Sequence, residues 1–71
     1  MEMIPVVSSN LEAIGYDKID EILRVRFLND SVYDYHLVPE HHYQGLLNAP
    51  SHGRYLDTYI KKGGYRYTKR R

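Results

Sequence analysis

The sequence predicts a small α+β domain in which two short helices lie on one face of a mainly antiparallel sheet. Apolar residues alternate in the segments before residue 39 and recur at helical spacing between residues 40 and 60. The expected order of elements is β-β-β-α-α-β within one domain of 71 residues. A run of strands followed by helices favours an α+β arrangement over a parallel α/β sheet.

Three strands are expected before the helices. After an extended start at residues 5–9, residues 11–16 form a first strand that enters a bend containing Gly15 and Asp17. Residues 22–28 and 32–38 alternate clearly, which is typical of half-buried strands. Asn29, Asp30 and Ser31 between them suit a hairpin connection.

The register of this hairpin is predicted from the two faces of its strands, because a slip of one residue would mix core with solvent. The apolar face then pairs Phe27 with Tyr33, Val25 with Tyr35 and Leu23 with Leu37. On the opposite face, Arg26 is expected opposite Asp34 and Arg24 opposite His36. Tyr65 and Tyr67 are expected to join this core.

Two helices are predicted next. Pro39 suits the first turn of a helix over residues 40–48, whose apolar residues are Tyr43, Leu46 and Leu47. Ser51 can cap a second helix that carries Leu56, Tyr59 and Ile60. Gly63 and Gly64 end it, and residues 65–70 alternate as a last strand.

Charge is unevenly distributed along the chain. Residues 1–60 carry four basic and nine acidic side chains, whereas the tail over residues 61–71 carries six basic side chains and no acidic one. Basic residues interleaved with tyrosines suit a polyanion such as RNA, since cations bind phosphate and rings stack on bases. The alternative is a solvated tail that only aids solubility.

Composition limits the class of protein. No cysteine is present for disulfides or thiolate metal sites, and no apolar run is long enough to span a bilayer. We therefore expect a cytoplasmic protein without membrane association. A domain this small buries little surface, so we expect it to be marginally stable or a homo-oligomer.

In order along the chain, these segments resemble the KTSC domain, a family found at the C-terminus of some lysyl-tRNA synthetases and as stand-alone bacterial and phage proteins. The resemblance rests on Ser8-Ser9, Ile14-Gly15-Tyr16-Asp17, Leu23-x-Val25-x-Phe27, Tyr33-x-Tyr35, Val38-Pro39, Tyr43, Ala49, Ser51-x-Gly53-x-Tyr55 and Ile60. Leu56-Asp57 stands where the family often has Phe-Asn, and His52 where lysine is common. The resemblance implies this fold and points to RNA binding.

The first candidate site is the segment Ser51, His52, Gly53, Arg54 and Tyr55. A helix N-terminus offers free backbone N–H groups, and an arginine can bind a phosphate through two nitrogens. Tyr16, beside the expected bend, is a further candidate for ligand contact. The alternative is an ordinary helix cap, with the glycine needed for packing and the arginine solvated.

The second candidate is the outer face of the sheet, where Arg24, Arg26, His36 and Arg66 are expected to project together. Such a strip can contact phosphates. The alternative is a set of exposed ion pairs, since Asp34 lies on the same face.

No catalytic or metal site is expected. His41 and His42 are adjacent on a helix and point about 100° apart, and no activated nucleophile or phosphate-binding loop stands in the sequence. We expect a non-enzymatic binding module for a phosphate-bearing ligand, RNA or a nucleotide, with no cofactor. The alternatives are a phage-type protein that sequesters a small nucleotide signal and a protein-interaction or inhibitor module.

Overall fold

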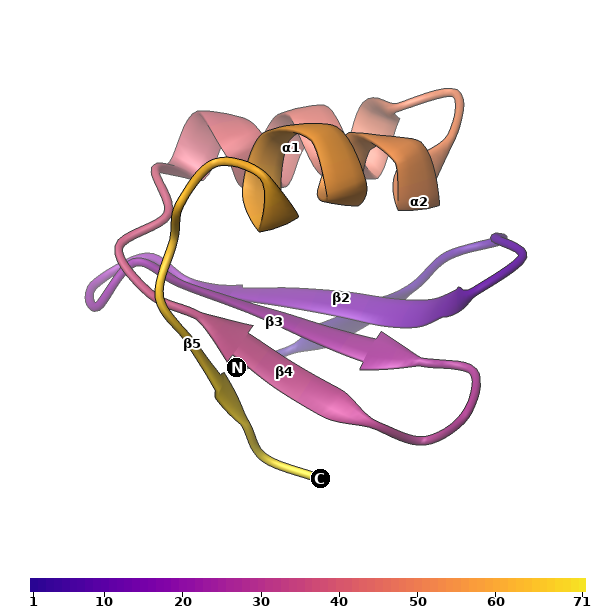
Figure 1. Cartoon of the computed structure of the whole chain (residues 1–71), viewed down its shortest axis with the longest axis horizontal. Helices are drawn as coiled ribbons and strands as arrows, with labels where there is room; N and C mark the ends of the chain where they lie inside the picture. Colours follow the sequence, from indigo (N-terminus) through magenta and orange to yellow (C-terminus); the bar gives the residue numbers. More distant parts are fainter.

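The computed structural model describes all 71 residues and has two layers (Figure 1). One layer is an antiparallel sheet of five strands in the order β1-β2-β3-β4-β5. The other is formed by helices that lie on one face of the sheet. The strands are β1 (Met3–Pro5), β2 (Leu11–Asp17), β3 (Ile22–Phe27), β4 (Val32–Tyr35) and β5 (Tyr67–Lys69). The predicted α+β class is confirmed, with one more strand than expected, the edge strand β1.

Two tight turns join β2 to β3 and β3 to β4. Asp17 Oδ1 accepts hydrogen bonds from the backbone N–H groups of Ile19 and Asp20, and this closes the first turn. Gly15 lies inside β2, opposite Met3 and Arg24, so the expected bend at Gly15 was wrong. The turn begins two residues later because the Asp17 carboxylate, rather than the glycine, organises it.

The register of the β3–β4 hairpin differs from the prediction by two residues. Phe27 N donates to Ser31 O, so the loop is formed by residues 28–30, with Asp30 in the left-handed region at a φ of 72°. The pairs are Leu23 with Tyr35, Arg24 with Asp34, Val25 with Tyr33 and Arg26 with Val32. A shift of two residues keeps each side chain on its face, so alternation alone could not distinguish the two registers.

The helical layer consists of α1 (Glu40–Asn48), α2 (His52–Tyr55) and a π-helical segment η1 (Leu56–Lys61) that continues α2. Pro39 precedes α1 in an extended conformation, and Pro50 follows it. Ser51 Oγ accepts a hydrogen bond from Arg54 N, as expected of a helix cap. The bounds of the first helix and the cap of the second are thus as predicted.

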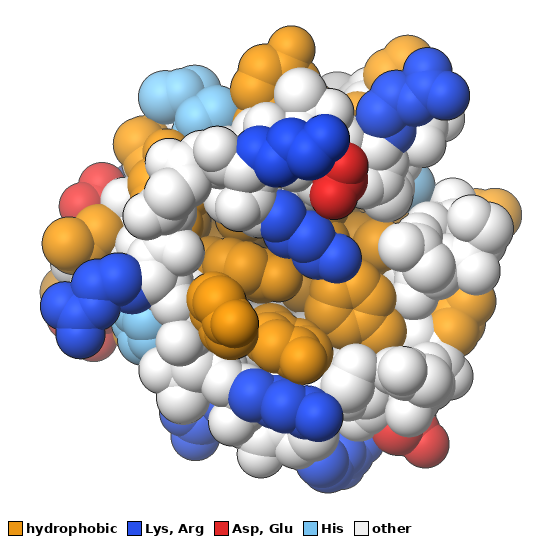
Figure 2. All heavy atoms as spheres, viewed as in Figure 1, with side chains coloured by type: hydrophobic (Ala, Val, Ile, Leu, Met, Phe, Trp, Pro, Cys, Tyr) orange, Lys and Arg blue, Asp and Glu red, His pale blue; other side chains and the backbone are white.

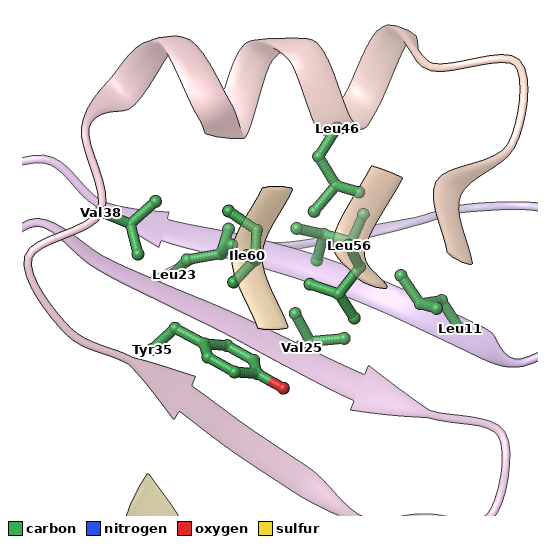
Figure 3. Packing of buried hydrophobic residues seen from close by; sticks show 9 residues of the cluster. Leu11, Leu23, Val25, Tyr35, Val38, Leu46, Leu56 and Ile60 are labelled. Carbon is green, nitrogen blue, oxygen red and sulfur yellow. The ribbon is translucent and has the colours of Figure 1, made fainter. Parts of the chain in front are cut away.

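The core lies between the sheet and the helices (Figure 3). It is built from nine buried residues: Leu11, Ile14, Leu23, Val25, Tyr35, Val38, Leu46, Leu56 and Ile60. None of them comes from the last eleven residues, so the core ends before β5.

Three residues expected in the apolar interior lie at the surface instead. Leu37 is 70% exposed, because β4 ends at Tyr35 and Leu37 turns away with a φ of 58°. Tyr59 is 51% exposed and Tyr67 is 64% exposed. The helices do not reach over β5, and this leaves Tyr67 uncovered.

None of the helices has the length and apolar character that a membrane crossing requires.

Candidate functional site

A hollow lies where the helices leave the sheet uncovered. It has a volume of about 640 Å³, which is within the range of small-ligand sites. It is lined by Ser9, Asn10, Phe27, Leu28, Asn29, Ser31, Tyr33, Tyr35, Lys61, Tyr65 and Tyr67. We call it the aromatic groove. Figure 2 shows apolar side chains open to solvent at the centre of this face, with Lys and Arg side chains above and below them.

The floor of the aromatic groove is a cluster of rings from neighbouring strands. The ring of Tyr33 lies 6.3 Å from that of Tyr35 and 5.8 Å from that of Tyr67, and Phe27 meets Tyr33 edge-on at 5.8 Å. Tyr33 and Tyr35 are two positions apart on β4, and Tyr67 is paired with Tyr35 across the sheet. Phe27 is two positions beyond Val25, the partner of Tyr33, so it lies diagonally beside Tyr33 on the same face. The cluster therefore presents ring faces and edges on a fixed backbone.

Two lysines reach over these rings from different elements. Lys61 Nζ at the end of η1 lies 5.3 Å from the centre of the Phe27 ring, and Lys69 Nζ on β5 lies 6.0 Å from that of Tyr33. Neither lysine has a carboxylate within 4.0 Å. Each thus has a cation–π contact and a free positive charge at the groove.

Most of the remaining tail cations have an acidic partner. Lys62 pairs with Asp57 at 3.4 Å, Arg70 with Asp34 at 3.4 Å and Arg71 with Asp30 at 4.0 Å. Of the six basic residues of the tail, only Arg66, Lys61 and Lys69 lack an acidic partner, and two of these three lie at the aromatic groove. The rings of the groove therefore have two unpaired ammonium groups beside them.

Tyr35, a buried residue, contributes a hydroxyl group to the floor of the groove. Burial raises the pKa of Tyr35 to about 12, and neighbouring Tyr33 and Tyr67 add to the shift. Figure 3 shows its ring extending from β4 along the lower side of the core, with the hydroxyl directed away from Val38. Because the phenol stays protonated, it remains a hydrogen-bond donor at any physiological pH.

Two asparagines form a polar end of the groove. Asn29 Oδ1 accepts from Ser31 N and Ser31 Oγ, and Asn10 Oδ1 accepts from Ser8 Oγ. These bonds fix the orientation of both amides, because a backbone N–H can only donate and the Ser8 hydroxyl already accepts from two backbone N–H groups. The Nδ2 groups are left as donors toward solvent.

The candidate segment at residues 51–55 is held largely by internal contacts. His52 Nδ1 donates to Leu46 O at 2.8 Å, and a Cβ added at Gly53 would lie 2.6 Å from Asn10 Oδ1. Ser51 caps the helix, and Tyr55 Oη lies 3.0 Å from His42 Nδ1. A second hollow of about 410 Å³ borders Ser51, Arg54 and Tyr55. Among the polar side chains of residues 51–55, only that of Arg54 has no hydrogen bond or ion pair.

Tyr16 lies elsewhere, at the far end of β2. Its hydroxyl donates to Val38 O at 2.5 Å, and its ring stacks on Tyr43 with centres 5.1 Å apart. Burial raises its pKa, with Glu21, Glu40 and Asp17 adding to the effect. These contacts tie β2 to the start of α1, so the structure does not bring Tyr16 together with residues 51–55.

On the outer face of the sheet, Arg24 and Arg26 are both paired with acidic side chains. Arg24 donates from Nε and Nη2 to the two oxygens of Asp34, at 2.7 and 2.9 Å, and Arg26 lies 3.3 Å from Glu12. His36 Nε2 lies 2.8 Å from Thr68 Oγ1, and Arg66 is exposed without an acidic partner. The predicted strip is therefore interrupted by ion pairs at Arg24 and Arg26, and of its arginines only Arg66 is left without an acidic partner.

Comparison with known proteins shows the family to which this chain belongs. The model of the KTSC domain matches residues 7–67. The chain belongs to the KTSC domain family. A crystal structure of a KTSC domain protein from Yersinia pestis superposes with a TM-score of 0.89 at 37% identity, covering 96% of this chain and 94% of that one.

Two sequence relatives agree with this assignment. An uncharacterized protein of Stutzerimonas stutzeri is 39% identical over 67 residues, which is 94% of each chain. A protein of Tsukamurella paurometabola is 42% identical over 59 residues, covering 83% of this chain and 88% of the relative. The resemblance inferred from the sequence is thus confirmed over nearly the whole length.

The aromatic groove of this KTSC domain was missed by reasoning from the sequence, which placed Tyr33, Tyr35 and Tyr67 together in the core. A signal was available in the last strand. Tyr67 and Lys69 are two residues apart and therefore share a face, and an unpaired lysine is almost never buried. A tyrosine that shares its face with a lysine indicates an aromatic surface open to solvent.

Proposed function

We propose that this KTSC domain is a non-enzymatic binding module for a ligand that carries both aromatic bases and phosphate, namely RNA or a nucleotide, and that it binds this ligand in the aromatic groove. The observation that supports the proposal best is the placement of Lys61 and Lys69 over the rings of Phe27 and Tyr33. Rings stack on bases, and ammonium groups beside them bind phosphate.

The chemistry of the groove favours binding over catalysis. Its lining contains no histidine, aspartate or glutamate that would act as a general base. It offers phenol hydroxyls, serine hydroxyls, amide groups and ammonium groups. These groups suit the recognition of an acceptor-rich ligand.

Two alternatives make different predictions. A module that sequesters a small nucleotide signal, as a phage-type protein would, should enclose its ligand at an interface between copies of the chain, since one short chain encloses little space. A protein-interaction module would use the exposed edge of β5, which offers unpaired backbone groups to a partner strand. Binding to a partner protein that survives nuclease treatment and high salt would identify the protein-interaction module.

The test is a titration with an oligouridylate of about ten nucleotides and with uridine monophosphate, each over a range of salt concentrations. Two ammonium–phosphate contacts predict a slope of log K against log salt of about −1.4 for the oligonucleotide, or about a sevenfold loss from 50 to 200 mM salt. A nucleotide held by one contact predicts about half that slope. A module that binds neither probe lacks the proposed function.

Replacing Tyr67 tests whether the ligand binds in the aromatic groove. Tyr67→Ala removes one exposed ring from the groove, and loss of one base-stacking contact predicts a fall in affinity of about 5- to 150-fold. Tyr59→Ala is the matched control, because Tyr59 is similarly exposed but borders the second hollow beside Ser51 and Arg54. Equal losses in both variants, or a loss only in Tyr59→Ala, would remove the groove as the site.

A further inference from the structure

The strand β5 forms one wall of the aromatic groove without belonging to the core. Tyr67 lines the groove, and Lys69 reaches over the Tyr33 ring. All three residues of β5 are exposed, and β5 is an edge strand whose only neighbour is β4. Hydrophobic burial therefore holds this strand only weakly, and its position must depend on polar contacts.

Besides the backbone hydrogen bonds to β4, these are side-chain contacts on the reverse side of β5. Side chains alternate along a strand, so Thr68 and Arg70 point away from the groove face that Tyr67 and Lys69 occupy. Thr68 Oγ1 lies 2.8 Å from His36 Nε2, and Arg70 Nη1 lies 3.4 Å from Asp34 Oδ2.

Asp34 is the centre of this arrangement. It is 1% exposed, although it lies on the outer face of the sheet. Arg24 holds both of its oxygens in a bidentate pair, which fixes the orientation of the carboxylate. Its Oδ2 atom is then presented to Arg70, which directly follows β5 and lies 36 residues further along the chain.

We propose that the Asp34–Arg70 pair is a clasp that holds β5 against β4 and so positions Tyr67 and Lys69 at the aromatic groove. The consequence for ligand binding rests on the proposed function, whereas the clasp itself belongs to the free protein. Asp34 and Arg70 do not line the groove. They are positioning residues that act through the side chains on the other face of β5.

Backbone amides on the body of the domain report whether the clasp is closed. Val32 N donates to Arg71 O at 2.8 Å, and His36 N donates to Arg66 O at 2.8 Å. Both carbonyl acceptors belong to the tail, whereas both donors belong to the segment around β4. If β5 detaches, these two amides lose their acceptors and exchange with solvent more quickly.

The experiment measures amide hydrogen exchange by NMR in Arg70→Gln, with Lys62→Gln as the control. Lys62 is an exposed tail residue outside the groove, so its replacement removes the same charge without touching Asp34. We expect exchange at Val32 and His36 to accelerate about tenfold or more in Arg70→Gln, because a hydrogen bond to a buried carboxylate is lost. Lys62→Gln should leave both rates unchanged, and Arg70→Lys should restore part of the protection. Unchanged exchange in Arg70→Gln would overturn the clasp.

Titration of the same variants with the oligouridylate tests the positioning role. We expect Arg70→Gln to bind more weakly than Lys62→Gln and to show a salt slope smaller by about 0.7, since one ammonium contact is lost when Lys69 moves away. If the amides respond but affinity and slope do not change, the positioning role is wrong. If the amides respond and even the unaltered protein binds no oligonucleotide, the clasp stands and the proposed function fails.

Discussion

The eight tyrosines of this chain fall into different structural roles, although the sequence gives them the same chemistry. Tyr35 is buried in the core, whereas Tyr67 is 64% exposed at the groove. Tyr16 donates its hydroxyl to Val38 O and stacks on Tyr43, so it is a structural link. The position of each tyrosine relative to the helical layer decides whether it stabilises the fold or remains open to a ligand.

Burial of Tyr35 predicts a distinct titration at high pH. Its pKa is raised from 10.0 to about 12, so the unfolded chain loses this proton at a lower pH than the folded one. The contribution of Tyr35 to stability is full below pH 10.0 and is lost as the pH rises toward 12.

Ultraviolet absorbance of phenolate measures this directly. We expect one group to titrate near pH 12 in the native protein and to be missing in Tyr35→Phe. Tyr67→Phe, which alters an exposed neighbour, should leave that last step in place. A wild-type curve in which every tyrosine titrates near pH 10 would contradict the burial of Tyr35.

At the scale of elements, the helices were more predictable than the sheet register. Pro39, Pro50 and Ser51 act within a few residues of themselves, so they define the bounds of α1 and the start of α2 from local chemistry alone. The register of β3 and β4 depends on whether the turn falls at residues 28–30 or one residue later. Both turn positions leave every side chain on the same face of the sheet. The alternation of apolar and polar residues therefore could not determine that Arg24 pairs with Asp34.

The site was less predictable than the fold. The Ser51 cap was correctly identified, but the contacts of Gly53 with Asn10 and of Arg24 with Asp34 join residues far apart in the chain. Which ring of the tyrosine set remains uncovered depends on how far the helices extend over the sheet. The spacing of Tyr67 and Lys69 indicates one uncovered ring, but no local pattern shows how far the helices extend over the other rings.

The junction between α1 and the second helical segment is predicted to weaken in acid. His42 lies against the rings of Tyr55, Tyr59 and Tyr65, and burial together with the neighbouring charge of His41 lowers its pKa. The unfolded chain therefore takes up a proton first as the pH falls. Stability from this group is present above about pH 6.5 and is lost as the pH falls below it.

Thermal unfolding measured between pH 8 and pH 5 tests whether protonation of His42 destabilises the fold. We expect Tm to fall less steeply with acidification in His42→Gln than in the wild-type protein. Tyr55→Phe removes the hydrogen bond to His42 Nδ1 but keeps the titrating ring, so its pH dependence should resemble that of the wild type. Identical pH profiles for wild type and His42→Gln would show that His42 does not couple to folding.

At the scale of the whole molecule, the basic tail lies outside the part of the sheet that the helices cover. The helices cover β2, β3 and part of β4, while β5 and the basic tail extend beyond them (Figure 1). The tail carries six basic residues, three of which pair with Asp30, Asp34 and Asp57. Acidic groups of the body thereby hold the tail in place, and the free lysines that remain lie over the aromatic groove.

The most direct test of the aromatic groove as a binding site is an NMR titration of the uniformly labelled protein with the oligouridylate at low salt. Binding in the groove predicts shifts of the Phe27, Leu28, Tyr33 and Tyr67 amides, with the Ser51 to Tyr55 amides unmoved at saturation. Shifts confined to residues 51–55 or to the outer face around Arg24 and Arg26, or no shifts at all, would contradict it.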